Sequence, residues 1–222
     1  MDIKSLEELQ TFLEQESSWR KKEIAFFFQL LNQRRKDKKG QVEEGQKTLL
    51  RAAWANLYAH WEGFVKQAAR AYLAYVAFQE IEFRQLKPNF AAILNRLALK
   101  DIENTKRIAP FLNALRQIEG GKFDKKLAAN SGVDTTSNLT HEVLLDIWNA
   151  IGLNIPDNFE LKRKSFDKLL ENRNKIVHGE RLFIDYKNGW EDYEQMRLTL
   201  LNSIEELKTE ILNAVHLKTY LR

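Results

Sequence analysis

Apolar side chains recur at the spacing of an α-helix along most of the chain, and charged residues fill the positions between them. Over residues 3–36 this pattern predicts one long helix, or two collinear helices with a weak point at Ser17-Ser18. The stretch ends in the basic run 34–40, where cations would complement the helix dipole and Gly40 would stop the helix. We interpret this run as a solvated helix end, with contact to a nucleic acid as the alternative.

A second stretch, over about 43–80, carries apolar residues around more of its circumference. So wide an apolar stripe predicts a central helix that touches neighbours on several sides. The break at Lys87-Pro88-Asn89 follows, because proline disfavours the helical conformation of the residue before it. Shorter helices are predicted over 89–100 and 102–118, closed by Gly120-Gly121.

The second half of the chain begins with its most loop-like residues, 120–137. Three further helices are predicted: one from Asn138 or Thr140 to Gly152, one over about 160–177 that stops at Gly179, and a long amphipathic one over about 190–217. Residues 182–190 are predicted to form a short turn or hairpin. No internal repeat or domain boundary is evident. We therefore predict one domain over 1–222, an all-α, up-and-down helical bundle with long N-terminal and C-terminal helices.

The amino-acid composition supports this fold class and reduces the number of possible functions. Only 9 Gly and 3 Pro among 222 residues argue against a sandwich, barrel or propeller, and 13 Phe and 5 Trp argue against disorder. The absence of cysteine excludes disulfides and Cys-ligated metals, and four scattered histidines make a His-built metal site unexpected. No signal peptide or membrane span is evident, so we expect a soluble, cytoplasmic protein with no cofactor. The net charge of +4 permits an anionic partner without requiring one.

One segment, 169–179, carries the candidate chemistry, since nucleophile elbows, phosphate loops and dinucleotide fingerprints are absent. On a helix, Asn174 and His178 lie four residues apart on one face, and the long Arg173 side chain can reach the same patch. Histidine can act as a general acid or base, and the arginine fork matches phosphate oxygens. These parts suit metal-free cleavage of RNA by its own 2′-hydroxyl.

The segment also has a purely structural interpretation. A His-Gly pair is a common helix stop, and Arg173 could pair with a neighbouring carboxylate. On the central helix, His60 is expected to be a core histidine, and Glu62 could simply pair with Lys66. Four large aromatic residues are expected in the core: Trp54, Trp61, Tyr72 and Trp148.

The motif Arg173-Asn174-x-x-x-His178, on the second-last helix of a bundle, resembles the R-x(4–6)-H signature of the HEPN superfamily, in which a polar Asn often follows the Arg. The segments 57–66 (LYAHWEGFVK) and 137–144 (SNLTHEVL) resemble the stand-alone bacterial subgroup labelled MAE-like or RiboL-PSP HEPN. The resemblance covers about 45–215, which leaves about 1–40 as an N-terminal helical extension.

This resemblance implies a homodimer whose two motifs face each other across a cleft, acting as a metal-independent endoribonuclease on single-stranded RNA in a toxin–antitoxin or antiphage system. Arg173 and His178 would be the catalytic pair, Asn174 their polar companion and Glu62 a supporting acid. An antitoxin or other defence protein would be the partner. The alternative is a non-catalytic HEPN module that binds RNA or protein. One subgroup carries a tyrosine two residues after the histidine for adenylylation; Glu180 here argues against that control.

Overall fold

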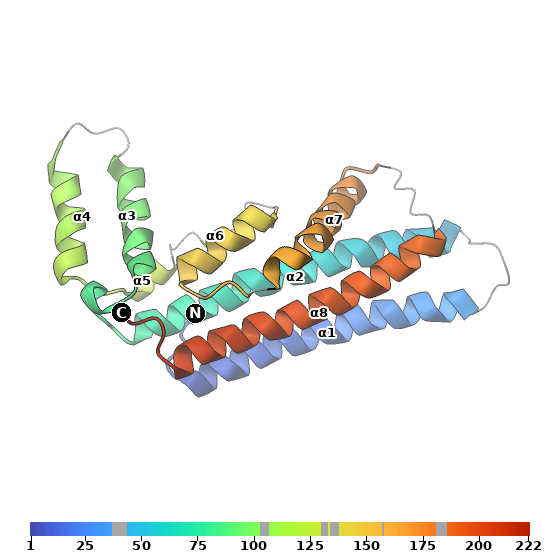
Figure 1. Cartoon of the computed structure of the whole chain (residues 1–222), viewed down its shortest axis with the longest axis horizontal. Helices are drawn as coiled ribbons and strands as arrows, with labels where there is room; N and C mark the ends of the chain where they lie inside the picture. The colour runs from blue at the N-terminus through green and yellow to red at the C-terminus, as the bar shows by residue number, and fades with distance from the viewer. Residues whose placement is uncertain (37–43, 103–106, 130–132, 134–137, 157, 181–185) are drawn as a thin grey trace.

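Three long helices form the body of the molecule (Figure 1). The computed structural model describes residues 1–36, 44–102, 107–129, 133, 138–156, 158–180 and 186–222. Helix α1 (Leu6–Lys36) runs along the bundle, α2 (Glu44–Phe78) returns beside it, and α8 (Tyr186–His216) runs in the same direction as α2. Helix α2 packs against α1, α5, α6, α7 and α8, which confirms the central position predicted from its wide apolar stripe.

Two shorter helices, α6 (His141–Ile151) and α7 (Phe159–Val177), lie across α2. Helix α6 begins where the Thr140 hydroxyl accepts a hydrogen bond from the Val143 N–H, and it ends at Gly152 in the left-handed conformation (φ 71°). A stacked pair fixes α7 on α2: the ring centroids of Trp61 and Phe166 are 4.9 Å apart. Helix α7 and its C-cap carry Arg173, Asn174 and His178.

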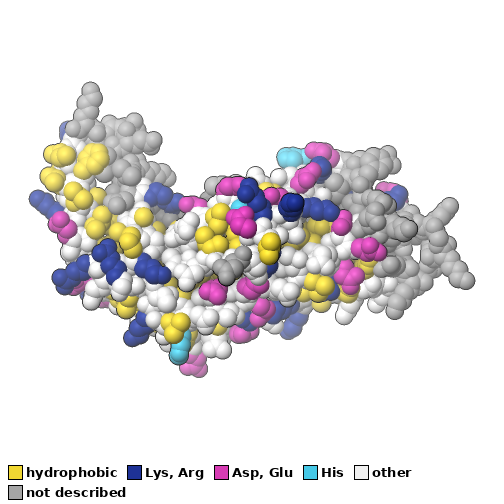
Figure 2. Space-filling view, viewed as in Figure 1, with side chains coloured by type: hydrophobic (Ala, Val, Ile, Leu, Met, Phe, Trp, Pro, Cys, Tyr) yellow, Lys and Arg dark blue, Asp and Glu magenta, His cyan; other side chains and the backbone are white. Residues whose placement is uncertain are grey.

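A helical hairpin made of α3 (Pro88–Ile102) and α4 (Ala109–Gly120) lies at the C-terminal end of α2, away from α7. The short helices η1 (Phe83–Gln85) and α5 (Lys125–Ala129) join it to the bundle, and Phe123 packs edge-on against Phe83 and Phe90. Apolar side chains remain exposed along one face of α4 and the residue before it, in the i, i+3, i+4, i+7 pattern: Ile108, Phe111, Leu112 and Leu115. Figure 2 shows apolar side chains gathered on this end of the molecule.

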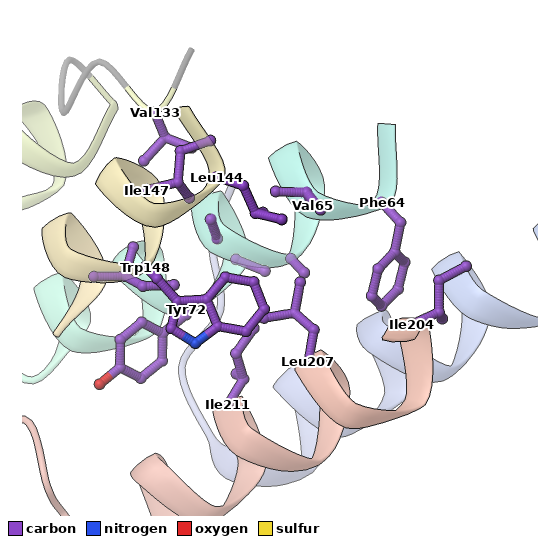
Figure 3. Close-up of a cluster of buried hydrophobic side chains, with 14 of the residues drawn as sticks. Phe64, Val65, Tyr72, Val133, Leu144, Ile147, Trp148, Ile204, Leu207 and Ile211 are labelled. Carbon is purple, nitrogen blue, oxygen red and sulfur yellow. The ribbon is translucent and has the colours of Figure 1, made fainter. Parts of the chain in front are cut away.

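The buried core runs along α2 (Figure 3). Side chains from three helices converge there: Phe64, Val65 and Tyr72 from α2, Leu144, Ile147 and Trp148 from α6, and Ile204, Leu207 and Ile211 from α8. The predicted core aromatics and the core histidine His60 are all buried. Within the described residues, no helix combines the length and the apolar character needed to cross a bilayer.

The all-α prediction is confirmed, and the described residues contain no strand. Helix α1 is continuous through Ser17-Ser18, where the buried Ser17 hydroxyl donates to the Glu14 carbonyl within the helix. The predicted loop 120–137 contains α5, and the rest of it falls partly outside the described residues.

The hairpin predicted for 182–190 is wrong over its described part, because 186–190 form the first turn of α8; 182–185 lie outside the described residues. Helix α1 is described as far as Lys36, and the rest of the basic run 34–40, with the expected helix stop at Gly40, lies outside the described residues.

Candidate functional site

The Arg173 guanidinium is held by residues from three parts of the chain. Its Nη1 donates one hydrogen bond of 2.8 Å to Asn174 Oδ1 and another of 3.2 Å to Asn138 Oδ1. Its central carbon lies 4.9 Å from the ring centroid of Tyr58 on α2, which is within cation–π distance. The α7 helix, the segment before α6 and the middle of α2 therefore meet at this side chain.

The sequence of α7 explains why Arg173 reaches α2. Leu169 is buried one turn earlier, and residues four apart share a helix face. Arg173 thus continues the face that packs on α2, at the point where this face becomes partly exposed. A long side chain at such an edge can bury its methylene stem and keep its charged end near solvent.

Tyr58 forms the floor beneath the guanidinium. Its hydroxyl accepts a buried hydrogen bond of 2.7 Å from the Leu139 backbone N–H, and it also interacts with the Glu62 carboxylate one turn further along α2. Burial raises the pKa of Tyr58 to about 12 and Glu62 adds to this, while the Leu139 hydrogen bond and the Arg173 charge oppose it. The phenol therefore stays neutral across the physiological pH range.

His178 lies at the C-terminal end of α7. Its backbone N–H bonds the Asn174 carbonyl, and Gly179 follows in the left-handed conformation (φ 71°). Gly179 N–H donates to Ile176 O and Glu180 N–H donates to Lys175 O, which is the Schellman arrangement. The helix-stop interpretation is thus correct for the backbone. The imidazole is exposed, and it makes no hydrogen bond or ion pair with the described residues.

The predicted site residues fall into two groups. Arg173 and Asn174 are in direct contact, and Glu62 reaches the same tyrosine as Arg173. The described residues show no side-chain contact between His178 and this group. Asn174, expected to orient the imidazole or donate to a phosphate, accepts a hydrogen bond from Arg173 through its amide oxygen, and its amide N–H groups can still donate.

Two residues of the site, Tyr58 and Asn138, were not predicted from the sequence. Both lie inside the segments 57–66 and 137–144 that carry the family resemblance, and this was the only signal pointing to them. Helical spacing cannot find them, since they reach Arg173 only through the packing of α6 and α7 on α2.

Electrostatically, Arg173 is held by neutral groups. Its two acceptors are amide oxygens, and none of the ion pairs between described residues includes it. On the same helix, Lys175 is paired with Glu171, and Arg163 with Glu142. Figure 2 shows both charge signs intermixed over this part of the surface. Arg173 therefore keeps its positive charge without an ion pair to any carboxylate of the described residues.

The described residues include no group of three or more His, Asp or Glu side chains that could hold a metal ion. In a comparison with known protein families, a family model described as HEPN_MAE_28990/-like HEPN matches residues 9–220 of the chain, from within α1 to beyond α8. No curated protein and no solved structure matches the chain.

Proposed function

The chain belongs to the HEPN superfamily as a stand-alone, MAE-like member, and from this premise we propose that it is a metal-independent endoribonuclease for single-stranded RNA. The observation that carries the proposal is the Arg173 guanidinium, which is fixed by two amide oxygens and an aromatic ring without losing its charge to a carboxylate. An anionic ligand would supply the missing counter-charge. HEPN domains commonly bind RNA, and a phosphodiester of the bound RNA would be this anion.

The proposed reaction needs one proton acceptor and one group that stabilises charge on phosphorus. The His178 imidazole takes the proton of the RNA 2′-hydroxyl, and the 2′-oxygen attacks the adjacent phosphorus. Arg173 stabilises the negative charge that builds on the phosphoryl oxygens. The bond from phosphorus to the 5′-oxygen then breaks, and an imidazolium returns the proton to that oxygen. The products are a cyclic 2′,3′-phosphate and a 5′-hydroxyl.

We further propose a homodimer in which the two motifs face each other across a cleft. Within one chain His178 has no side-chain contact with Arg173, so a second copy offers a way to bring an imidazole and a guanidinium to one phosphate. A toxin–antitoxin or antiphage role, with an antitoxin or defence protein as partner, follows from the HEPN resemblance alone.

The test is cleavage of a 5′-labelled, mixed-sequence single-stranded RNA in EDTA, with the cut ends mapped. We expect Arg173→Ala and His178→Ala each to lower the rate by at least about 10²-fold, the usual cost of losing a charge-stabilising donor or a general base. Arg163→Ala, on the same helix but paired with Glu142, and His216→Ala, at the exposed end of α8, are the matched controls. Full activity in both site variants, or a requirement for a divalent metal, would contradict the proposal.

A non-catalytic HEPN module that binds RNA or protein is the competing function, and the lack of contact between His178 and Arg173 within the chain is the observation that favours it. Expression in cells separates the two functions. A ribonuclease produced alone should arrest growth, and His178→Ala should relieve the arrest. A binding module should have no such effect on growth.

A further inference from the structure

We propose that Tyr58 and Asn138 are positioning residues that hold the Arg173 guanidinium so that its Nε–Nη2 edge is reserved for an RNA phosphate. The proposal rests on the function proposed above and identifies how the active site is prepared before RNA binds.

The hydrogen-bond donors of Arg173 are only partly used within the described protein. A guanidinium has five N–H groups: two on Nη1, two on Nη2 and one on Nε. Both Nη1 hydrogens have acceptors, one on Asn138 and one on Asn174. Neither Nε nor Nη2 has an acceptor among the described residues. One N–H from each of these atoms points in parallel along a single edge, which is the geometry that binds two phosphate oxygens at once.

The Tyr58 ring restricts the plane of the guanidinium. Two hydrogen bonds to one nitrogen still permit the group to tilt. The Tyr58 ring, 4.9 Å from the central carbon, restricts this tilt and attracts the cation without accepting any of its hydrogens. An aspartate or glutamate in the same place would restrict the group equally well but would also neutralise its charge.

Tyr58 and Asn138 are linked to each other through the backbone of Leu139. The Tyr58 hydroxyl accepts the N–H of Leu139, the residue directly after Asn138. Because Tyr58 and Leu139 are buried, this bond fixes the backbone beside an otherwise exposed Asn138 side chain. The tyrosine therefore acts twice: its ring contacts Arg173, and its hydroxyl places the asparagine that contacts Arg173.

The first test reads the position of Arg173 in the protein without RNA, through its side-chain Nε–H resonance in an NMR spectrum, assigned by its loss in Arg173→Lys. We expect Tyr58→Leu to remove the ring-current shift of this resonance and Tyr58→Phe to preserve it. Tyr75→Leu, which alters another buried tyrosine of α2, should leave the resonance unchanged. An unaltered resonance in Tyr58→Leu would overturn the proposal whether or not the protein cleaves RNA.

The second test is kinetic and uses the same RNA substrate. We expect Tyr58→Leu to lower kcat by about 10- to 100-fold, the scale of a misplaced catalytic group, and Asn138→Ala to lower it by less. In an Arg173→Lys background neither change should reduce the residual rate further, because both act through the arginine fork. Equal losses in both backgrounds would show a general structural effect and overturn the proposal. If the unmodified protein cleaves no RNA, the proposed function fails, while the resonance still decides the position of Arg173.

Discussion

Arg20 and Arg173 both lie on an aromatic ring, as Arg197 does on Phe28, and the first two differ in what balances their charge. Arg20, on α1, is 4% exposed and lies 4.3 Å from the Trp19 ring; its Nη1 contacts Glu16 Oε2 at 2.6 Å. Arg173 is partly exposed, lies on Tyr58 and bonds only amide oxygens. An arginine whose charge is cancelled internally serves the fold, whereas one held by neutral groups still carries its charge for a ligand.

The surroundings of Arg20 support its structural role. A Cβ at Gly63 of α2 would lie 3.1 Å from Arg20 Nη2, so the guanidinium packs closely against this helix at a glycine. The Phe64 ring lies 5.9 Å from its central carbon. Arg20 therefore joins α1 to α2 in the place where a larger residue than glycine would crowd it.

The largest expected effect separates the two arginines by stability. Arg20→Ala should lower the free energy of unfolding by about 3 kcal/mol, because it leaves Glu16 without its partner in a largely buried contact. Arg173→Ala should lower it by less than about 1 kcal/mol, as expected for a partly exposed polar contact. Urea denaturation followed by circular dichroism measures both values. Equal losses, or a larger loss for Arg173→Ala, would contradict the assignment of structural and functional roles.

The next effect tests whether neutral acceptors matter. Asn174→Asp gives Arg173 a carboxylate partner like that of Arg20, so an RNA phosphate must compete with it for the guanidinium. We expect affinity for a non-cleavable 2′-O-methyl RNA to fall by about tenfold, which corresponds to about 1.4 kcal/mol, with little change in stability. Fluorescence anisotropy measures this affinity.

Asn172→Asp is the control, since it adds the same charge to α7 two residues away. If both variants weaken RNA binding equally, net charge alone explains the loss, and the special role of the neutral acceptors is wrong.

Sequence patterns predict the helices of this protein well because each has a clear period and a clear end. Thr140, Gly152 and Gly179 mark boundaries that the structure confirms. The turn or hairpin predicted for 182–190 is wrong over 186–190. Asn188 and Gly189 favour a turn locally, yet Trp190 and Tyr193 are buried and keep 186–190 in α8.

The site was predictable only where its residues are neighbours in sequence. Arg173 and Asn174 are adjacent, and the structure shows them in contact. Tyr58 and Asn138 reach them through the packing of α2, α6 and α7, a tertiary relation that no helical period records. Tyr58 and Asn138 could therefore be identified only from the three-dimensional structure, whereas the motif from Arg173 to His178 is visible in the sequence.

The smallest expected effect is a pH dependence of stability that arises at His60, a buried histidine near Arg20. His60 is 4% exposed, with its Nε2 3.0 Å from Glu23 Oε2 and its ring edge-on to Trp19. Burial lowers the pKa of His60, helped by the Arg20 charge and opposed by Glu23. Below the unfolded value of about 6.5 the unfolded chain therefore binds more protons than the folded chain, so stability present above pH 6.5 is lost as the pH falls.

We expect this loss to approach at most about 1.4 kcal/mol per pH unit, the limit for one proton, between pH 6.5 and the lowered pKa. Urea denaturation at a series of pH values from 7.5 to about 5.5, above the range where most carboxylates titrate, measures it. His60→Gln should flatten the slope, because the buried ring that must stay neutral is gone. The Arg173 contact with Tyr58 should persist through this range, since the pKa of Tyr58 is raised to about 12 and no proton is exchanged there. If the pH dependence of stability persists in His60→Gln, other titrating groups cause it. The surroundings of Arg20 and Arg173 would then not differ in acid sensitivity.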